Sequence, residues 1–193
     1  MNSQKQKIVI TGAPSSGKST TMQLIRQQMS DKIIVVPESA AVLLSGGFPA
    51  PSHDDIEQIR AFQLAIIQTH ISLEEIFSKQ NPTINWMLLD RTIVDGAGFW
   101  PDGADAYFKE FKVDPEKEFA RYDFVLFFEL PDKKAFGGLN DLRFHNYEQS
   151  LESEKRLREV WSKHPRFIEI KATEIFEDKI QVAVGIINEI TKV

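Results

Sequence analysis

Two glycines, a lysine and a serine near the start of the chain have the types and spacing needed to bind a phosphate group. Gly12 and Gly17 enclose four residues, and Lys18 and Ser19 follow directly. Glycines adopt backbone dihedrals that other residues avoid, so the amide hydrogens between them can turn inward around a phosphate. Lys18 would then reach the β- and γ-phosphates, and Ser19 would offer a hydroxyl to Mg²⁺. This spacing predicts a loop that binds the phosphate tail of a nucleotide.

The run agrees at every position with the pattern G-x-x-x-x-G-K-[ST]. A strand-like run over 8–11 ends just before it, and an amphipathic helix pattern begins near Lys18, as phosphate binding at a helix N-terminus requires. We therefore expect ATP, or GTP, with Mg²⁺ as the cofactors, and we expect Thr20 near an inner phosphate. The residues predicted to bind the nucleotide are Gly12, Ala13, Pro14, Ser15, Ser16, Gly17, Lys18, Ser19 and Thr20.

An acidic residue at the end of a buried strand would supply the second part of a nucleotide site. Asp90 ends the apolar run 87–90, and Arg91 follows at once. Asp90 could hold Mg²⁺ or accept a proton from an acceptor hydroxyl. Aspartate also favours turns, and an arginine beside a carboxylate often forms only a surface ion pair. Because the phosphate loop is present, we predict Asp90 as a metal ligand and, with Lys18 and Arg91, as catalytic.

Other side chains could face the same crevice. Glu38 follows the apolar run 33–36, so it is a candidate base or ribose ligand, or simply a carboxylate at a helix start. Whether Glu38 or the aspartate of the later strand is the base stays open. Gln63, Gln68 and His70 on a long helix could read a nucleoside, although helical glutamine usually faces solvent.

A cation is also needed over the transferred phosphoryl group. Arg143 lies just past Gly137-Gly138, in a segment over 131–160 that we interpret as a mobile lid. Closure of a lid keeps water away from the phosphate. Lys155 and Arg158 are interspersed with glutamates and fit a charged helix face better. Arg143 is therefore the catalytic candidate in this segment.

Short apolar runs alternate with helix patterns along the chain. The runs lack period-2 alternation, which is typical of strands that are covered on both faces in a parallel sheet. This alternation predicts an α/β doubly wound sheet. Strands are expected at 8–11, 33–36, 87–90, 124–129 and 167–170, and loops that could line a site at 45–52, 95–103 and 131–140. Helices are expected at 19–29, 52–77, 114–122, 147–163 and 175–190, with Ser52 and Asp55 starting the second.

Two further short patterns resemble signatures of other nucleotide-binding proteins but occur at the wrong positions. Leu44-Ser45-Gly46-Gly47 copies the start of a transporter-ATPase signature, but it precedes the long helix, so we interpret it as a turn that ends a helix. Asp95-Gly96-Ala97-Gly98 imitates a GTPase element but lies five residues beyond the strand end, and no N-K-x-D guanine reader occurs in the sequence. The four histidines lack metal-ligand spacing.

Composition limits the class of protein. The chain has 193 residues, the size of one domain, and 42% hydrophobic with 26% charged residues fits a globular core. With no cysteine, there is no disulfide framework or thiolate site. A net charge of −5 does not suit a protein that coats nucleic acid. Membrane-length apolar runs and a secretion signal are both missing, so we expect a cytoplasmic protein with no nucleic-acid or membrane partner.

The sequence resembles the small P-loop nucleoside and nucleotide kinases, and most closely the AAA-type ATP-binding family that includes ribosylnicotinamide kinase domains. This resemblance implies one P-loop NTPase domain over 1–193, built as a three-layer α/β/α sandwich with a five-stranded parallel sheet in the order 2-3-1-4-5. The residues that carry it are Gly12–Ser19, Val36-Pro37-Glu38-Ser39-Ala40, Phe62-Gln63, Leu89-Asp90-Arg91 and Asp141-Leu142-Arg143-Phe144.

The resemblance also implies roles for particular residues. Glu38, Asp90 and Arg91 would surround the acceptor, Arg143 would contact the ATP phosphates, and Lys171-Ala172-Thr173 would lie beside the adenine. The sequence lacks a second lid arginine and a recognisable base-reading set, so it does not identify the acceptor.

Two functions remain open at this point. One is an ATP- and Mg²⁺-dependent phosphotransferase with a small nucleoside-like or nucleotide acceptor. The other is a regulatory ATP- or GTP-binding module whose slow hydrolysis switches a partner surface. A nucleotide binder that has lost catalysis is a third reading, and the sequence leaves homo-oligomerisation open.

Overall fold

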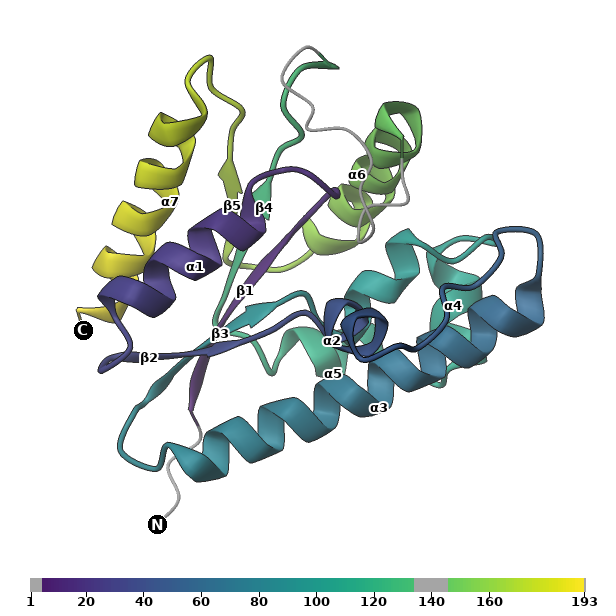
Figure 1. Cartoon of the computed structure of the whole chain (residues 1–193), viewed down its shortest axis with the longest axis horizontal. Helices are drawn as coiled ribbons and strands as arrows, with labels where there is room; N and C mark the ends of the chain where they lie inside the picture. The colour runs from purple at the N-terminus through teal and green to yellow at the C-terminus, as the bar shows by residue number, and fades with distance from the viewer. Residues whose placement is uncertain (1–4, 134–145, 193) are drawn as a thin grey trace.

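The computed structural model describes residues 5–133 and 146–192 (Figure 1). Strands and helices alternate along the chain, as the apolar runs predict. The strands are β1 (Gln6–Gly12), β2 (Ile33–Val36), β3 (Trp86–Asp90), β4 (Phe124–Phe128) and β5 (Phe167–Ile170). The helices are α1 (Lys18–Gln28), α2 (Ser39–Ser45), α3 (Ile56–Gln80), a 3₁₀ helix η1 (Ile93–Gly98), α4 (Ala104–Glu110), α5 (Pro115–Phe119), α6 (Tyr147–Trp161) and α7 (Phe176–Thr191).

The strands form one parallel sheet in the order β2-β3-β1-β4-β5, which confirms the predicted order. Ile10 of β1 pairs with Asp90 of β3, and Gly12 pairs with Phe128 of β4. Since all strands run the same way, their carboxyl ends meet at one edge of the sheet. That edge is where parallel α/β sheets bind ligands.

Each face of the sheet is covered by helices, so the molecule has three layers (Figure 1). Ile8 and Ile10 point into a core with apolar residues of α1 and α7. Val9, between them in sequence, points into the opposite core with residues of η1, α4 and α6. Burial on both faces explains why the strands are continuous apolar runs.

The long helix starts later than the sequence predicts, because Asp55 and not Ser52 is the N-cap and α3 begins at Ile56. The Asp55 side chain accepts hydrogen bonds from the backbone amides of Glu57 and Gln58 at 3.0 and 3.1 Å. These bonds satisfy two amides of the first turn, which have no partner inside the helix.

Leu44-Ser45-Gly46-Gly47 is the helix-ending turn that the sequence predicts, because α2 ends at Ser45 and Gly46 is its C-cap.

The prediction of a loop over 95–103 is wrong in its first part. The 3₁₀ helix η1 occupies Ile93–Gly98, and the Thr92 and Asp95 side chains cap its start reciprocally. α4, which the sequence did not predict, begins at Ala104, directly after the segment. A Cβ at Gly98 would lie 2.5 Å from Leu157 Cγ, so glycine here permits close packing against α6 instead of marking a loop.

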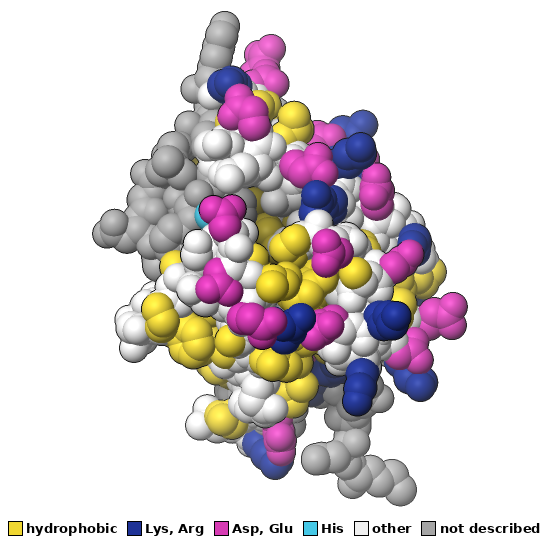
Figure 2. Space-filling view, turned by 90° about the vertical axis from the view of Figure 1, so that its right-hand side faces the viewer, with side chains coloured by type: hydrophobic (Ala, Val, Ile, Leu, Met, Phe, Trp, Pro, Cys, Tyr) yellow, Lys and Arg dark blue, Asp and Glu magenta, His cyan; other side chains and the backbone are white. Residues whose placement is uncertain are grey.

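Charged side chains of both signs are interspersed on the face shown in Figure 2, around apolar side chains near its centre. Among residues 5–133 and 146–192, no helix is both long and apolar enough to cross a membrane.

Candidate active site

The turn between β1 and α1 has the conformation that the glycine spacing predicts. Gly12 has a φ of +127°, and a Cβ there would lie 2.2 Å from the carbonyl oxygen of Phe128. Gly17 has a φ of +101° and is the N-cap of α1. The turn therefore ends at a helix N-terminus, where the helix dipole and free amide hydrogens favour an anion.

Lys18, the first residue of α1, folds back over this turn. Its ammonium group donates to the Gly12 carbonyl at 3.0 Å, the Ala13 carbonyl at 2.6 Å and the Ser16 hydroxyl at 3.3 Å. Burial and the nearby Arg91 charge lower the pKa of Lys18, whereas the carboxylates of the same edge oppose that change. Oxygens of a bound phosphate would stabilise the ammonium form in place of these carbonyls.

Mg²⁺ fits the polar atoms that this edge offers. Oδ1 of Asp90 is buried and has no hydrogen-bond partner. Ser19 is exposed in the first turn of α1. No group of three or more histidine, aspartate or glutamate side chains within the described ranges could hold a metal by itself. Ser19 and Asp90 therefore suit an ion that keeps waters and takes most of its other ligands from nucleotide oxygens.

Arg91 lies between two carboxylates immediately after β3. Its Nε donates to Glu38 Oε1 at 3.0 Å, and its Nη1 donates to Asp95 Oδ1 at 3.3 Å. The guanidinium carbon is 5.0 Å from the centre of the Phe99 ring. Arg91 has a φ of +61°, a conformation that costs a non-glycine residue about 1 kcal/mol or more. These contacts hold the buried side chain at the sheet edge despite that cost.

Asp90 is buried and close to other charges. Burial and the negative charge of Glu38 raise its pKa, while the positive charges of Lys18 and Arg91 act in the opposite direction. A carboxyl group with a raised pKa accepts a proton or a metal ion more readily near neutral pH than an ordinary aspartate does. Asp90 thus has the electrostatic environment expected of a functional group.

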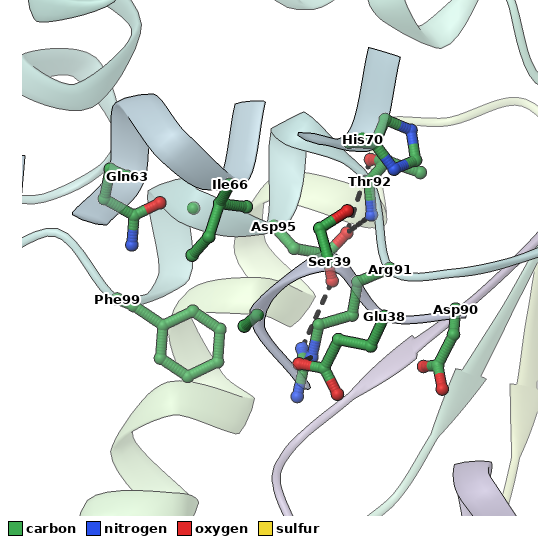
Figure 3. Close-up of a pocket in the computed structure, with 12 residues that line it drawn as sticks. Glu38, Ser39, Gln63, Ile66, His70, Asp90, Arg91, Thr92, Asp95 and Phe99 are labelled. Atoms are coloured by element: carbon green, nitrogen blue, oxygen red, sulfur yellow. Dashed lines mark hydrogen bonds and ion pairs between the residues drawn. The ribbon is translucent and has the colours of Figure 1, made fainter. Parts of the chain in front are cut away.

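A pocket begins beside these charges and extends toward α3. In Figure 3, Gln63, Ile66 and His70 approach it from α3, and Phe99 lies across from Gln63. Oε1 of Gln63 and Oγ of Ser39 are buried without hydrogen-bond partners. The residues that line the pocket are Glu38, Ser39, Ala40, Gln63, Ile66, His70, Asp90, Arg91, Thr92, Asp95, Gly96 and Phe99.

The free volume of this pocket is about 50 Å³. A water molecule needs roughly 10–15 Å³ of such space, so the pocket holds a few waters and not a nucleoside. Binding of a larger molecule would therefore require side chains at its mouth to move.

The family comparison agrees with this site. A family model described as an AAA domain matches residues 7–178. The chain belongs to this AAA domain family. The match includes the phosphate turn, Asp90, Arg91 and every residue that lines the pocket. No curated protein sequence matches this AAA domain.

Solved structures show the fold to which this AAA domain belongs. Deoxyadenosine kinase from M. mycoides, solved with bound dATP, has a TM-score of 0.64 and 17% identity over 95% of this chain and 99% of its own. Thymidylate kinase from Candida albicans has a TM-score of 0.64 and 16% identity over 96% of this chain and 92% of its own. The AAA domain therefore has the P-loop kinase fold of deoxynucleoside and thymidylate kinases.

Most of the predicted site residues are brought together. The phosphate turn, Glu38, Asp90 and Arg91 meet at the carboxyl edge of the sheet, and Gln63 and His70 line the adjacent pocket. Gln68 does not line the pocket, because it is exposed on α3, where its side-chain amide donates to the Ser72 hydroxyl at 3.4 Å. Arg143 lies outside the described residues, as do all of residues 134–145 of the proposed lid over 131–160.

Arg158, one cation of the lid segment, has structural contacts. Arg158 forms ion pairs with Glu129, Glu154 and Glu169 and is positioned over the Phe127 ring, which fits a charged helix face. Glu129 also accepts a hydrogen bond from the Ala172 amide at 3.0 Å, which anchors the loop before α7.

Three residues in this AAA domain matter to the site and were not singled out individually by the sequence, although two of them fall in the segment 95–103 that was predicted to line a site. Asp95 accepts hydrogen bonds from Thr11 and Arg91 and so ties the phosphate turn to the pocket. Phe99 supplies an aromatic wall. Lys179 of α7 donates to the Ser16 carbonyl at 2.8 Å and supports the turn from behind. Each is isolated in the sequence, so no local pattern identifies its role.

Proposed function

We propose that this protein is an ATP- and Mg²⁺-dependent kinase that phosphorylates a hydroxyl group of a small nucleoside-like molecule. The proposal rests chiefly on the phosphate turn and the carboxylate-lined pocket, which meet at one sheet edge. Lys18 of the turn lies close enough to Asp90 and Glu38 for both carboxylates to influence its pKa. A donor site and an acceptor site in contact are what phosphoryl transfer requires.

The residues divide into a nucleotide side and an acceptor side. Backbone amides of residues 12–17 and Lys18 would hold the phosphates, and Ser19 and Asp90 would hold Mg²⁺. When bound, ATP supplies the phosphoryl group and Mg²⁺ neutralises charge on its oxygens. Glu38 or Asp90 would take the proton from the acceptor hydroxyl, and Arg91 holds Glu38 in place.

The charge of the pocket favours an acceptor that is itself uncharged. Three carboxylates, Glu38, Asp90 and Asp95, line it together with one guanidinium group, Arg91. An acceptor that already carries a phosphate would be repelled by this excess of negative charge. Gln63 and Phe99 would instead suit the polar edge and flat face of a planar ring. A nucleoside therefore fits better than a nucleotide.

The experiment is a phosphorylation screen with ATP and Mg²⁺ against nucleosides, nicotinamide riboside and nucleoside monophosphates. We expect turnover of at least one uncharged nucleoside-like compound. Lys18→Ala should reduce kcat by about 100-fold or more, because it removes a cation that stabilises transition-state charge. Lys32→Ala changes an exposed lysine and serves as the matched control.

Slow ATP hydrolysis that no acceptor accelerates would contradict the kinase proposal. In that case nucleotide-dependent binding of a partner, the behaviour of a regulatory module, would be the function to pursue.

A further inference from the structure

Lys179 of α7 is a buried cation that lies behind the phosphate turn. The residue is only 2% exposed. Its ammonium group donates to the Ser16 carbonyl at 2.8 Å and to the Glu129 carbonyl, and it lies 5.5 Å from the centre of the Phe128 ring. Two carbonyls and a ring face offer partners for all three ammonium hydrogens. Lys179 therefore links the end of the phosphate turn to the residue that follows β4.

The partners of this ammonium group are carbonyl oxygens, so they do not neutralise its charge. Burial lowers the pKa of Lys179 to about 8, while the charges of Glu129 and Glu154 act in the opposite direction. The side chain is therefore mostly protonated at pH 7. Both carboxylates form ion pairs with Arg158. A positive charge thus lies beside the phosphate turn, where it favours a bound anion.

α7 covers the outer side of the turn. Figure 1 shows α7 beside α1, and the two helices share one apolar core. A Cβ at Gly17 would lie 3.0 Å from Phe176 Cε2 and 3.2 Å from Ile180 Cδ1. Both of these side chains belong to α7, so Lys179 approaches the turn from outside and leaves its inner side to a ligand.

The bond to Ser16 determines where the next amide hydrogen points. No peptide bond among the described residues is cis, so the carbonyl and the amide hydrogen of the Ser16–Gly17 peptide point in opposite directions. Because the carbonyl points to α7, the Gly17 amide hydrogen points away from α7 and into the turn. Gly17 is the N-cap of α1, and amides at this position have no partner inside the helix.

We propose that Lys179 is a positioning residue that aims the Gly17 amide at the nucleotide phosphates and strengthens their binding by its charge. The inference rests on the nucleotide binding in the proposed function and adds a residue from α7 to that site. A peptide whose carbonyl accepts a bond from a cation is also a stronger N–H donor, because linked hydrogen bonds polarise one another. Lys179 would act through this peptide and not by contact with a phosphate.

Isothermal titration calorimetry of the full chain with MgATP, and with inorganic triphosphate and Mg²⁺, tests the effect on affinity. Lys179→Met keeps a flexible side chain but removes the charge and the donors. We expect it to raise both dissociation constants about tenfold, as the loss of a hydrogen bond from a charged group does. The two factors should be equal, because inorganic triphosphate contains only the part of ATP that the turn would hold.

Two further variants separate the charge of Lys179 from its place in the fold. Lys179→Arg keeps a cation with several donors and should restore most of the affinity. Lys192→Met removes an exposed lysine at the C-cap of α7 and is the matched control, with no expected effect. Urea unfolding measures the stability of each variant separately from its affinity.

The Gly17 amide can also be observed directly. The dipeptide Ser-Gly occurs twice in the chain, at 16–17 and at 45–46. A chain labelled with ¹³C at serine carbonyls and ¹⁵N at glycine therefore gives two correlated amide signals in NMR spectra. On addition of MgATP, the Gly17 amide proton should move downfield as it bonds to phosphate, and it should move less in Lys179→Met. Gly46, at the end of α2, is the internal control.

Unchanged affinity for MgATP in Lys179→Met would overturn this proposal and leave the kinase proposal intact, even if that variant is less stable. A loss of affinity that Lys179→Arg shares fully, or that inorganic triphosphate does not show, would overturn it too. If the wild type binds MgATP but phosphorylates no acceptor, the kinase proposal fails and the titrations still decide the role of Lys179. A wild type that binds neither compound would overturn both proposals.

Discussion

Arg91 and its neighbours show how single residues determine the chemistry of this site. Arg91 is held between Glu38 and Asp95, so each of these carboxylates has a cationic partner. Asp90, one residue earlier, has no such partner for Oδ1 and lies close to Lys18. The site therefore contains two carboxylates that share the charge of Arg91 and one, Asp90, that is available to a ligand.

The raised pKa of Asp90 predicts how activity depends on pH. Burial and Glu38 raise this pKa to about 7, so Asp90 carries a proton below that pH and is ionised above it. If ionised Asp90 holds Mg²⁺, kcat/KM should increase as the pH rises through about 7. Glu38→Gln removes a negative charge, so the inflection of its remaining activity should move to lower pH.

The measurement is a profile of kcat/KM between pH 5.5 and 8.5 for both proteins. A flat wild-type profile would rule out this role for Asp90. Loss of all activity in Glu38→Gln would instead identify Glu38 as the base, which was the alternative left open by the sequence.

At the scale of elements, α3 has one face buried at the pocket and another face exposed to solvent. Gln63 and His70 are buried at the pocket, whereas Leu64, Gln68 and Ile71 are exposed. The cap at Asp55 fixes where the helix begins, and packing against the sheet decides which residues turn inward. A helix with this pattern has a weak amphipathic signal, because its inner face is partly polar.

Gln63 and Gln68 provide a matched pair on α3. Gln63→Leu should raise the KM for the acceptor about tenfold or more, with little change in the KM for ATP, because the lost amide would no longer bond the acceptor. Gln68→Leu should leave both constants unchanged, since that side chain is exposed.

Steady-state kinetics with the acceptor and ATP varied separately measure this difference. Gln63 Oε1 has no partner in the free protein, so Gln63→Leu should not lower stability. Equal effects of the two substitutions would show that Gln63 does not read the acceptor.

η1 and α4 are two helices that the sequence pattern did not predict. The glycines of 96–98 and Pro101 suggest a loop when read locally. In the folded chain, Gly96 accommodates the Tyr107 ring and Gly98 accommodates Leu157. Those contacts depend on where α4 and α6 pack, which the residues 95–103 do not encode.

At the scale of the whole molecule, a buried charge cluster joins separate elements behind the pocket. Glu74 of α3 pairs with Lys7 of β1 and accepts two bonds of 2.9 Å from Arg121, which follows α5. His70 Nε2 lies 3.4 Å from Glu74 Oε2. The cluster thus fixes α3 against the sheet and steadies one wall of the pocket.

Glu74 should make the free energy of unfolding depend on pH in the acidic range. Burial alone would raise its pKa, but His70, Lys7 and Arg121 together lower it to about 2. A carboxylate with a lowered pKa contributes stability above the unfolded value of about 4.5, and that contribution disappears as the pH falls toward 2. The maximum contribution is about 3 kcal/mol.

Urea unfolding at pH 7 and at pH 3 measures this contribution. Glu74→Gln should lower the free energy of unfolding by about 3 kcal/mol at pH 7, with a smaller difference from wild type at pH 3. Glu75→Gln alters an exposed neighbour and should have no measurable effect. A pH-independent loss in Glu74→Gln would mean that packing, rather than charge, accounts for the effect.

The sequence by itself determined the phosphate turn and the strands, and its resemblance to the P-loop kinases implied the sheet order. A turn of eight consecutive residues depends on local backbone freedom, and strands buried on both faces must be apolar runs, so both features leave a contiguous pattern. The sequence also identified Glu38, Asp90 and Arg91, because residues that end parallel strands share one edge.

Only the tertiary structure decided which side chains complete the pocket and how α3 is turned. Asp95 of η1 and Phe99, its C-cap, line the pocket with Gln63 of α3 only after the helices pack on the sheet. Lys179 of α7 likewise reaches the phosphate turn only in the folded chain. Packing direction and helix rotation depend on contacts between distant residues. A local pattern therefore does not specify them, and Gln63 and Gln68 could not be told apart before the fold was known.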